Sequence, residues 1–307
     1  MPADLRDFRG RFPHIETDAQ FCTLSFDLRS PLPKTLTFAG NIGFLTKAMA
    51  EPNVSAIITT PQLLEAARAR GAVSAKMGFV LVENPRQEFF LFHNALSTHA
   101  DFYVKRQGFQ CGENSNIHPA STVSRDGVHI GKNVCIEAGV VIKPNVQIGD
   151  DCVIRAGTIV GGKGFQYLRG VDGTPIAIAH VGGVRIGNRV EIHGGCAIDR
   201  HIFDHDTIVG DDTKFDNHVQ FAHGSCIGKR CLVAAAATIS GSVRIGDDVW
   251  IGPNSTICDS LTIGDKAAIS LGSVVVRDVP GGMRVTGNFA EPHLQFLKRQ
   301  RIGSATS

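Results

Sequence analysis

The chain has 307 residues, a formal net charge of +2 and 43% hydrophobic residues, with a mean hydropathy near zero. These values are typical of a soluble globular protein, long enough for one large domain or two ordinary ones. There is no polybasic signature and no apolar run near the roughly 20 residues of a membrane helix, so we expect neither a nucleic-acid partner nor an integral membrane segment.

The N-terminus and the cysteines predict a cytoplasmic protein. The first residues, "MPADLRDFRGRF", lack the apolar core of a secretory signal. The eight cysteines contain no Cys-x-x-Cys pair, so neither a zinc ribbon nor a disulfide framework is indicated. We interpret them as reduced thiols that fill tight turns as small apolar side chains.

Residues 1–110 predict a small α/β domain. The strand patterns "SAIITT" and "GFVLVE" alternate with the helical patterns "IGFLTKAMA" and "PQLLEAARARG". The stretch "NPRQEFFLFHNALSTHADFYV" predicts a helix that leads into the next domain.

Residues 111–285 carry a repeat of six. An aliphatic or aromatic residue recurs at every sixth position: Ile130, Ile136, Ile142, Ile148, Ile154 and Val160, then Ile186, Ile192 and Ile198, then Val209 and Phe215, and from Phe221 through Ile227, Val233, Ile239, Ile245, Ile251, Ile257, Ile263 and Ile269 to Val275. Neither a helix nor an ordinary strand has this period. Three hexads, each a short strand and a turn, would close one triangular coil of about 18 residues, with every sixth side chain pointing inward. The predicted fold class is therefore mainly β, a parallel β-helix over about 116–279.

Two interruptions and a tail complete the chain. Residues 161–183 and 199–206 break the count and should protrude from the column. Loops on a rigid scaffold often carry function, although neutral insertions remain the alternative. Residues 286–307 predict a C-terminal tail with a short basic helix.

His223 and Gly241 occupy the same slot of the hexad, one coil apart, and Asp259 follows one coil later. Adjacent coils should lie about 4.8 Å apart, as strands in a sheet do. A histidine can take a proton from an attacking amine near neutral pH, and a glycine N–H can hold the oxyanion that forms on a thioester carbonyl. Asp216 or Asn217 are candidates for orienting the imidazole. The alternative is that His223 is a hydrogen-bonded histidine at the surface or in a turn, with no catalytic role.

A metal site is a rival interpretation. His218 and His223 form His-x-x-x-x-His on a hexapeptide column, which resembles the metal pair of the gamma-class carbonic anhydrases. In that family a third histidine completes the zinc site across a subunit boundary, and His180 or His193 would supply it here. That family has no N-terminal α/β domain of this kind.

Longer motifs resemble another family. "GGVRIGNRVEIHGGCAIDR", "DTIVGDDTKFDNHVQFAHGSCIG" and "ISGSVRIGDDV" are similar to the UDP-3-O-acylglucosamine N-acyltransferases of lipid A biosynthesis. The resemblance implies a left-handed β-helix, a homotrimer, no metal or other cofactor, and transfer of an acyl group to the amine of a UDP-linked amino sugar. It also implies His223 as general base and the Gly241 amide as oxyanion donor.

The same resemblance implies a nucleotide site in the N-terminal domain. "FAGNIGF" places Phe38 and Phe44 to stack on uracil and Asn41 to pair with its imide edge. A helix-start Asn between two core Phe residues is the alternative. "GFQY" contributes Phe165 and Tyr167 near the substrate, and Gln220 and Asp199 are expected to bind substrate as well.

The donor stays open between acyl carrier protein and acyl-CoA. Ser260 stands where the family has a second histidine, Gly224 follows the base in place of an Asn, and the C-terminal extension is short. A CoA-dependent nucleotide-sugar acyltransferase is thus one alternative. A β-helix that binds nucleotide sugars without turnover is another.

Overall fold

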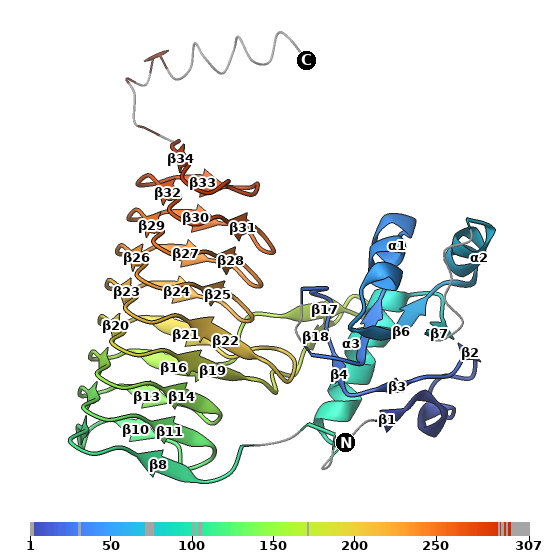
Figure 1. The fold of residues 1–307 in the computed structure, drawn as a ribbon, viewed down its shortest axis with the longest axis horizontal. Helices are drawn as coiled ribbons and strands as arrows, with labels where there is room; N and C mark the ends of the chain where they lie inside the picture. The colour runs from blue at the N-terminus through green and yellow to red at the C-terminus, as the bar shows by residue number, and fades with distance from the viewer. Residues whose placement is uncertain are drawn as a thin grey trace.

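The computed structural model describes residues 3–29, 32–70, 77–99, 102–103, 106–170, 172–287, 289, 292 and 294–295. Figure 1 shows a three-sided column of short strands with a separate α/β domain beside its middle. Within the described ranges, no helix is both long and apolar enough to cross a bilayer.

The N-terminal domain is built on a five-stranded sheet with the order β2-β7-β6-β5-β4. Only β2 runs antiparallel to its neighbour. The strands of this sheet are β2 (Ile15–Thr17), β4 (Thr23–Leu24), β5 (Thr35–Phe38), β6 (Val54–Thr59) and β7 (Gly78–Leu81). The helices are α1 (Ile42–Ala50), α2 (Pro61–Ala69) and α3 (Pro85–Ser97), and β1 (Ala3–Asp4), the 3-10 turn Leu5–Phe8 and β3 (Gln20–Phe21) lie at the N-terminal edge. The predicted strands and helices of this domain are confirmed.

Helices cover both faces of this sheet. Successive strand residues point to opposite faces, so Ile57 packs in the core with helices α1 and α2, while Ile58 packs with α3. The α3 core is rich in phenylalanine, with Phe89, Phe90 and Phe92 all buried. Helix α3 begins where the Asn84 side chain accepts a hydrogen bond from the Gln87 amide and ends before the chain turns toward the column.

The column has three parallel sheets, one for each side of a triangle. The first side contains β10 (Thr122–Val123), β13 (Val141–Ile142), β16 (Ile159–Gly162), β21 (Ala197–Asp199), β24 (Gln220–Phe221), β27 (Thr238–Ile239), β30 (Thr256–Ile257) and β33 (Val274–Val275). The second contains β8 (Phe109–Cys111), β11 (Val128–Ile130), β14 (Val146–Ile148), β19 (Gly183–Ile186), β22 (Asp206–Val209), β25 (Cys226–Ile227), β28 (Arg244–Ile245) and β31 (Thr262–Ile263). The third contains β9 (Asn116–Ile117), β12 (Cys135–Ile136), β15 (Val153–Ile154), β20 (Glu191–Ile192), β23 (Lys214–Phe215), β26 (Leu232–Val233), β29 (Trp250–Ile251), β32 (Ala268–Ile269) and β34 (Arg284–Val285).

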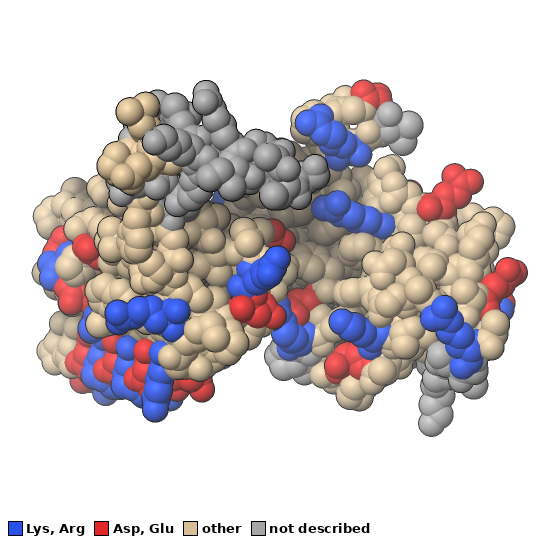
Figure 2. All heavy atoms as spheres, turned by 90° about the horizontal axis from the view of Figure 1, so that it is seen from above, with Lys and Arg blue, Asp and Glu red and all other residues tan. Residues whose placement is uncertain are grey.

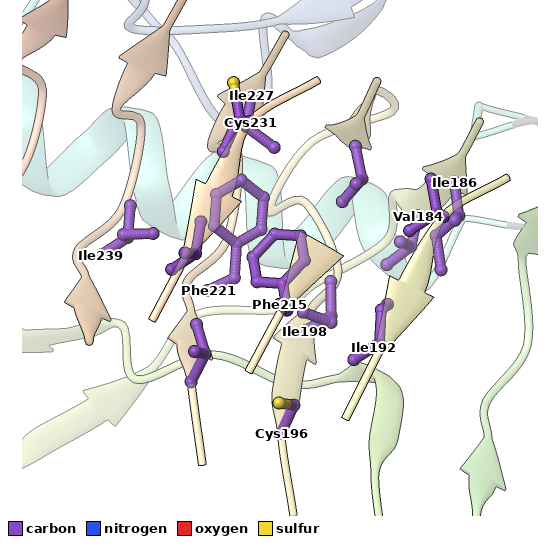
Figure 3. Packing of buried hydrophobic residues seen from close by; sticks show 14 of the residues in the cluster. Val184, Ile186, Ile192, Cys196, Ile198, Phe215, Phe221, Ile227, Cys231 and Ile239 are labelled. Carbon is purple, nitrogen blue, oxygen red and sulfur yellow. The ribbon is translucent and has the colours of Figure 1, made fainter. Parts of the chain in front are cut away.

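The repeat of six is confirmed by the core of this column. Every residue of the predicted inward series, from Ile130 to Val275, is buried in one continuous cluster. The largest members lie at the middle, where the rings of Phe215 and Phe221 meet edge to face with centroids 5.5 Å apart (Figure 3). The column extends beyond the predicted 116–279, from Phe109 to Val285, so the expected boundary after residue 110 falls inside its first strand. The C-terminal helix expected within 286–307 lies largely outside the described residues.

Both interruptions of the repeat leave the column, as predicted, and both enter the core of the α/β domain. Residues 161–183 form an arm with the antiparallel hairpin of β17 (Tyr167–Arg169) and β18 (Pro175–Ala177), which lies between the two domains (Figure 1). Leu168 and Ile178 of the arm are buried with α3. Phe203, from the second interruption, packs against Phe90 with ring centroids 6.4 Å apart. These insertions therefore fix one domain against the other.

Candidate active site

A cleft of about 1100 Å³ lies between the two domains. Figure 2 shows the hollow that separates the two lobes, with both basic and acidic side chains along its rim. Six of the residues predicted from sequence line this cleft: Phe38, Asn41, Phe44, Phe165, His223 and Gly241. The predicted base and the predicted aromatic pair thus face one space, although they are far apart in sequence.

His223 and Gly241 are stacked as the repeat predicts. Phe221 pairs with Ile239 across adjacent strands, and the next pairing joins Ile239 to Ile257. The His223 carbonyl accepts a hydrogen bond from Ser242 N at 3.0 Å, which locks the two corners together. A Cβ atom on Gly241 would lie 2.5 Å from His223 Cε1, so the imidazole rests directly on the glycine backbone. Glycine is needed here because this contact leaves no room for a side chain.

The Gly241 amide is available for a ligand. Its N–H donates to no acceptor among the residues that the structure describes, and the residue lines the cleft. A buried backbone donor without a partner is uncommon in folded proteins. This N–H can therefore hold an oxygen atom of a bound substrate.

The environment of His223 keeps its imidazole neutral. The residue is 8% exposed, and this burial lowers its pKa below the usual value. The Asp259 carboxylate, in the same hexad slot two coils later, opposes the shift and raises the pKa. Since the lowering dominates, His223 is a free base near neutral pH.

Asp216 and Asn217 do not orient this imidazole, so that expectation is corrected. Asp216 Oδ1 lies 3.8 Å from His193 Nδ1, and Asn217 Oδ1 accepts a hydrogen bond from Gly194 N. Both residues follow β23, on the third side of the column, whereas His223 follows β24 on the first side. They are near His223 in sequence but belong to another corner.

The aromatic pair is arranged as a narrow sandwich. The rings of Phe38 and Phe44 are 6.4 Å apart and 25° from parallel. A flat nucleotide base stacked between the two rings needs a ring-to-ring distance of roughly 7 Å, because each stacking contact takes about 3.5 Å. The two rings therefore need to separate only slightly to admit it. Asn41 also caps α1, because its Oδ1 accepts the Phe44 amide at 2.8 Å. Asn41 therefore starts the helix, as the alternative interpretation expected, although the flanking Phe38 and Phe44 are only half-buried, and Asn41 also lines the cleft.

Basic residues in the cleft were missed by the sequence argument. Lys47 from α1, Arg86 from α3 and Arg29 from the loop after β4 all line it. Arg29 donates to the Ser242 carbonyl and to Thr262 Oγ1, both at 3.2 Å, and so joins the α/β domain to the column. Only the folded chain brings these separate segments together, and no local motif marks them.

A second, smaller cleft of about 400 Å³ shares His223, Gly241 and Phe165 with the first. Asp199 and Gln220 line it and are hydrogen bonded to each other at 2.8 Å. Burial raises the pKa of Asp199. Phe165 lines both clefts and is 89% exposed. Tyr167 packs against Phe165, with ring centroids 4.9 Å apart, and is not among the residues that line these two clefts, so its role in binding substrate stays a prediction.

The alternative metal site is not assembled within one chain. Over the described ranges, no three His, Cys, Asp or Glu side chains are grouped to hold a metal ion. His218 lies at a corner with a φ of 59° and packs against Gly195, away from the cleft that His223 lines. His180 does lie against His223, with ring centroids 5.4 Å apart.

Comparisons with known proteins agree with the repeat and the fold. Residues 127–162 match a family model described as bacterial transferase hexapeptide (six repeats), and residues 242–277 match one described as hexapeptide repeat of succinyl-transferase. The chain is similar in structure to a UDP-N-acetylglucosamine acyltransferase from Campylobacter jejuni, with a TM-score of 0.52 and 25% identity over 62% of this chain and 73% of that one. The repeat, the three-sided column and these matches define a hexapeptide-repeat protein with a left-handed β-helix, as predicted.

Within that class, the sequence is similar to proteins named UDP-3-O-acylglucosamine N-acyltransferase. A UDP-3-O-acylglucosamine N-acyltransferase of Bordetella pertussis is 36% identical over 168 residues, which are 53% of this chain and 45% of that protein. The enzyme of the same name from Rhizobium meliloti is 39% identical over 151 residues, 49% of this chain and 42% of its own length. The chain thus matches less than half the length of these relatives. The family resemblance noted in the sequence is confirmed over that extent.

Proposed function

We propose that this protein is an N-acyltransferase that moves an acyl group from a thioester carrier to the amine of a UDP-linked amino sugar. The observation that carries the proposal is the shared cleft, in which a neutral histidine and an unpaired glycine amide face a nearly parallel pair of phenylalanine rings. The names of the related proteins support the same substrate class.

His223 acts as the general base in the proposed reaction. It takes a proton from the sugar amine while the nitrogen attacks the thioester carbon, forming the C–N bond. The carbonyl oxygen becomes an oxyanion that accepts the Gly241 N–H. When this intermediate collapses, the C–S bond breaks, and the departing sulfur takes the proton from His223. Atoms and charges balance without a covalent enzyme intermediate.

The α/β domain holds the nucleotide in this proposal. The uracil ring enters between Phe38 and Phe44, and the Asn41 amide forms hydrogen bonds with the polar edge of the uracil. Lys47 and Arg86 are placed to face the diphosphate, since cations and phosphate oxygens form strong charge-assisted hydrogen bonds. The sugar then extends from the rings toward His223.

The donor approaches from the second cleft. Phe165 lies where the two clefts meet and is exposed enough to cover a bound acyl group. Asp199 and Gln220 give this cleft a polar wall. Acyl carrier protein is our first choice of donor, and acyl-CoA is the alternative. The homotrimer and the cytoplasmic setting belong to the proposal on the sequence argument alone.

Replacement of His223 tests the reaction. His223→Ala should lower kcat by roughly 10²- to 10⁴-fold, with the KM for the UDP-sugar nearly unchanged. Phe38→Leu, on the nucleotide side, should instead raise that KM. Rates with acyl carrier protein and CoA thioesters, measured in parallel, identify the donor. Retention of most turnover by His223→Ala would exclude this role, and sugar binding without turnover on either donor would indicate a binding protein.

A further inference from the structure

The arm of residues 161–183 brings a second histidine to the proposed base. His180 stands near the point where the arm returns to the column, and its ring meets the His223 ring at 74° with centroids 5.4 Å apart. The two residues are 6% and 8% exposed. Gly164, at the outgoing end of the arm, packs against both rings, and a Cβ there would lie 2.6 Å from His223 Cδ2 and 3.1 Å from His180 Nε2.

Helix α3 fixes the arm just before His180. Asn94 donates to the Ala177 carbonyl and accepts from the Ala179 amide, both at 2.9 Å. His93 Nε2 lies 2.9 Å from the Ala179 carbonyl, and Ile178 is buried in the α3 core. Three hydrogen bonds and one apolar anchor therefore set the position of the His180 ring.

The hydrogen-bond partner of His180 fixes its tautomer. Nδ1 lies 3.0 Å from the Ile178 carbonyl. A carbonyl oxygen only accepts, so Nδ1 carries the hydrogen and Nε2 keeps a free lone pair. Burial lowers the pKa of His180 to about 4, so the ring stays neutral near neutral pH. Nε2 of His180 is buried and has no hydrogen-bond partner among the described residues.

His223, in turn, lacks a hydrogen-bond acceptor at its Nδ1 among the residues that the structure describes. A base that works through Nε2 carries its hydrogen on Nδ1, and that hydrogen requires an acceptor. Within the part of the chain that the structure describes, His223 Nδ1 is likewise buried and without a hydrogen-bond partner. A buried polar atom left unpaired costs about 1–3 kcal/mol, so two complementary atoms in touching rings should pair. The structure holds no direct bond between them, so pairing takes a turn of the His223 ring or one bridging water.

We propose that His180 is the positioning residue of the His223 base, accepting through Nε2 the hydrogen on His223 Nδ1. This inference rests on the function proposed above, because it assigns the orienting role within that reaction. His180 does not touch the substrate. It holds His223 in the tautomer whose Nε2 faces the amine, and it stabilises the imidazolium that forms when the proton is taken.

Two amide substitutions test this role with matched chemistry. The Gln side chain places its oxygen where Nε2 lies, whereas the shorter Asn reaches only the position of Nδ1. His180→Gln should therefore retain most of kcat. His180→Asn and His180→Phe should both lower kcat, on the order of 10²-fold, with the KM for the UDP-sugar unchanged. Equal loss in His180→Gln and His180→Asn would overturn the proposal, as would full kcat in His180→Phe.

A second measurement needs no substrate. ¹⁵N spectra of histidine-labelled protein report the ring tautomer, and the His223 signals are assigned by their loss in His223→Ala. We expect the Nδ1–H form in the parent and in His180→Gln, and the Nε2–H form to grow in His180→Asn. Asp259→Asn, which alters the other polar group acting on His223, should leave the tautomer unchanged. A tautomer that follows Asp259 and ignores His180 would refute the inference, whereas absent acyl transfer with the expected tautomers would refute only the reaction.

Discussion

Adding one methyl group at Gly241 should disable the site without removing any catalytic atom. The Cβ of Gly241→Ala would lie 2.5 Å from His223 Cε1 and 3.0 Å from Nε2. Ordinary carbon contacts are about 3.5–4.0 Å, so the imidazole must retreat by roughly 1 Å. The φ of Gly241 is not in the left-handed region, so the backbone accepts alanine and the backbone N–H is kept. Any loss then comes from the displaced ring.

The expected loss follows from how little space surrounds the ring. Gly164 packs closely against the same imidazole, which limits its retreat. A misplacement of about 1 Å at a reacting group can cost on the order of 10²-fold in rate. Overpacking of this kind also destabilises a fold by about 1–3 kcal/mol. We therefore expect kcat to fall on the order of 10²-fold, while the KM for the UDP-sugar changes little because the nucleotide side is untouched.

The assay measures initial rates of thiol release with a UDP-linked amino sugar as acceptor, together with thermal unfolding. Gly194→Ala is the matched control. Gly194 follows Ile192 by two positions, as Gly241 follows Ile239, but its Cβ would meet Ala156 O at 3.2 Å and Asn217 Oδ1 at 3.4 Å, and no imidazole. A Gly241→Ala protein with the parent rate would refute the reasoning, and so would an equal loss in Gly194→Ala.

Three further predictions follow from burial and charge. Because Asp259 raises the pKa of His223, Asp259→Asn should move the acid limb of the kcat/KM profile to lower pH, and an unmoved limb would count against this pairing. Phe203→Ala should cost about 3–5 kcal/mol of unfolding free energy in urea titrations, because the fully buried ring joins the two domains. Burial lowers the pKa of His93 to about 4, so protonation of the unfolded chain should remove up to about 3 kcal/mol between pH 6.5 and 4. His93→Gln should flatten this loss in urea titrations at the two pH values, and the same slope in both proteins would contradict it.

The column could be predicted almost entirely from sequence, because its structure is periodic. Each coil contacts only its neighbours, so one period fixes which side chains point inward and which residues stack. The series from Ile130 to Val275 and the alignment of His223 with Gly241 both follow from counting. Counting by 18 residues also places Asp216 at a different position of the coil from His223. The wrong prediction that Asp216 or Asn217 orients the imidazole came from their closeness to His223 in sequence.

The rest of the site depends on contacts that have no period. Nothing in the arm sequence shows that Ile178 is buried against α3, or that Asn94 bonds to the backbone beside it. His180 was considered only as a possible metal ligand, since its neighbour could not be known without the docked arm. Arg29, Lys47 and Arg86 come from three separate segments of the α/β domain and meet only in the fold.

The insertions explain why the two halves of the cleft form one site. Phe203 and Ile178 lie within the stretch of sequence that forms the column, but their side chains pack in the core of the α/β domain. The α/β domain therefore completes its core with residues that the column supplies, and cannot move away from it without exposing them to water. The same insertion that anchors the domain also carries Gly164 and His180 onto the base. Substitutions in the α3 core should consequently change the rate at His223 as well as stability, which a freely hinged nucleotide domain would not produce.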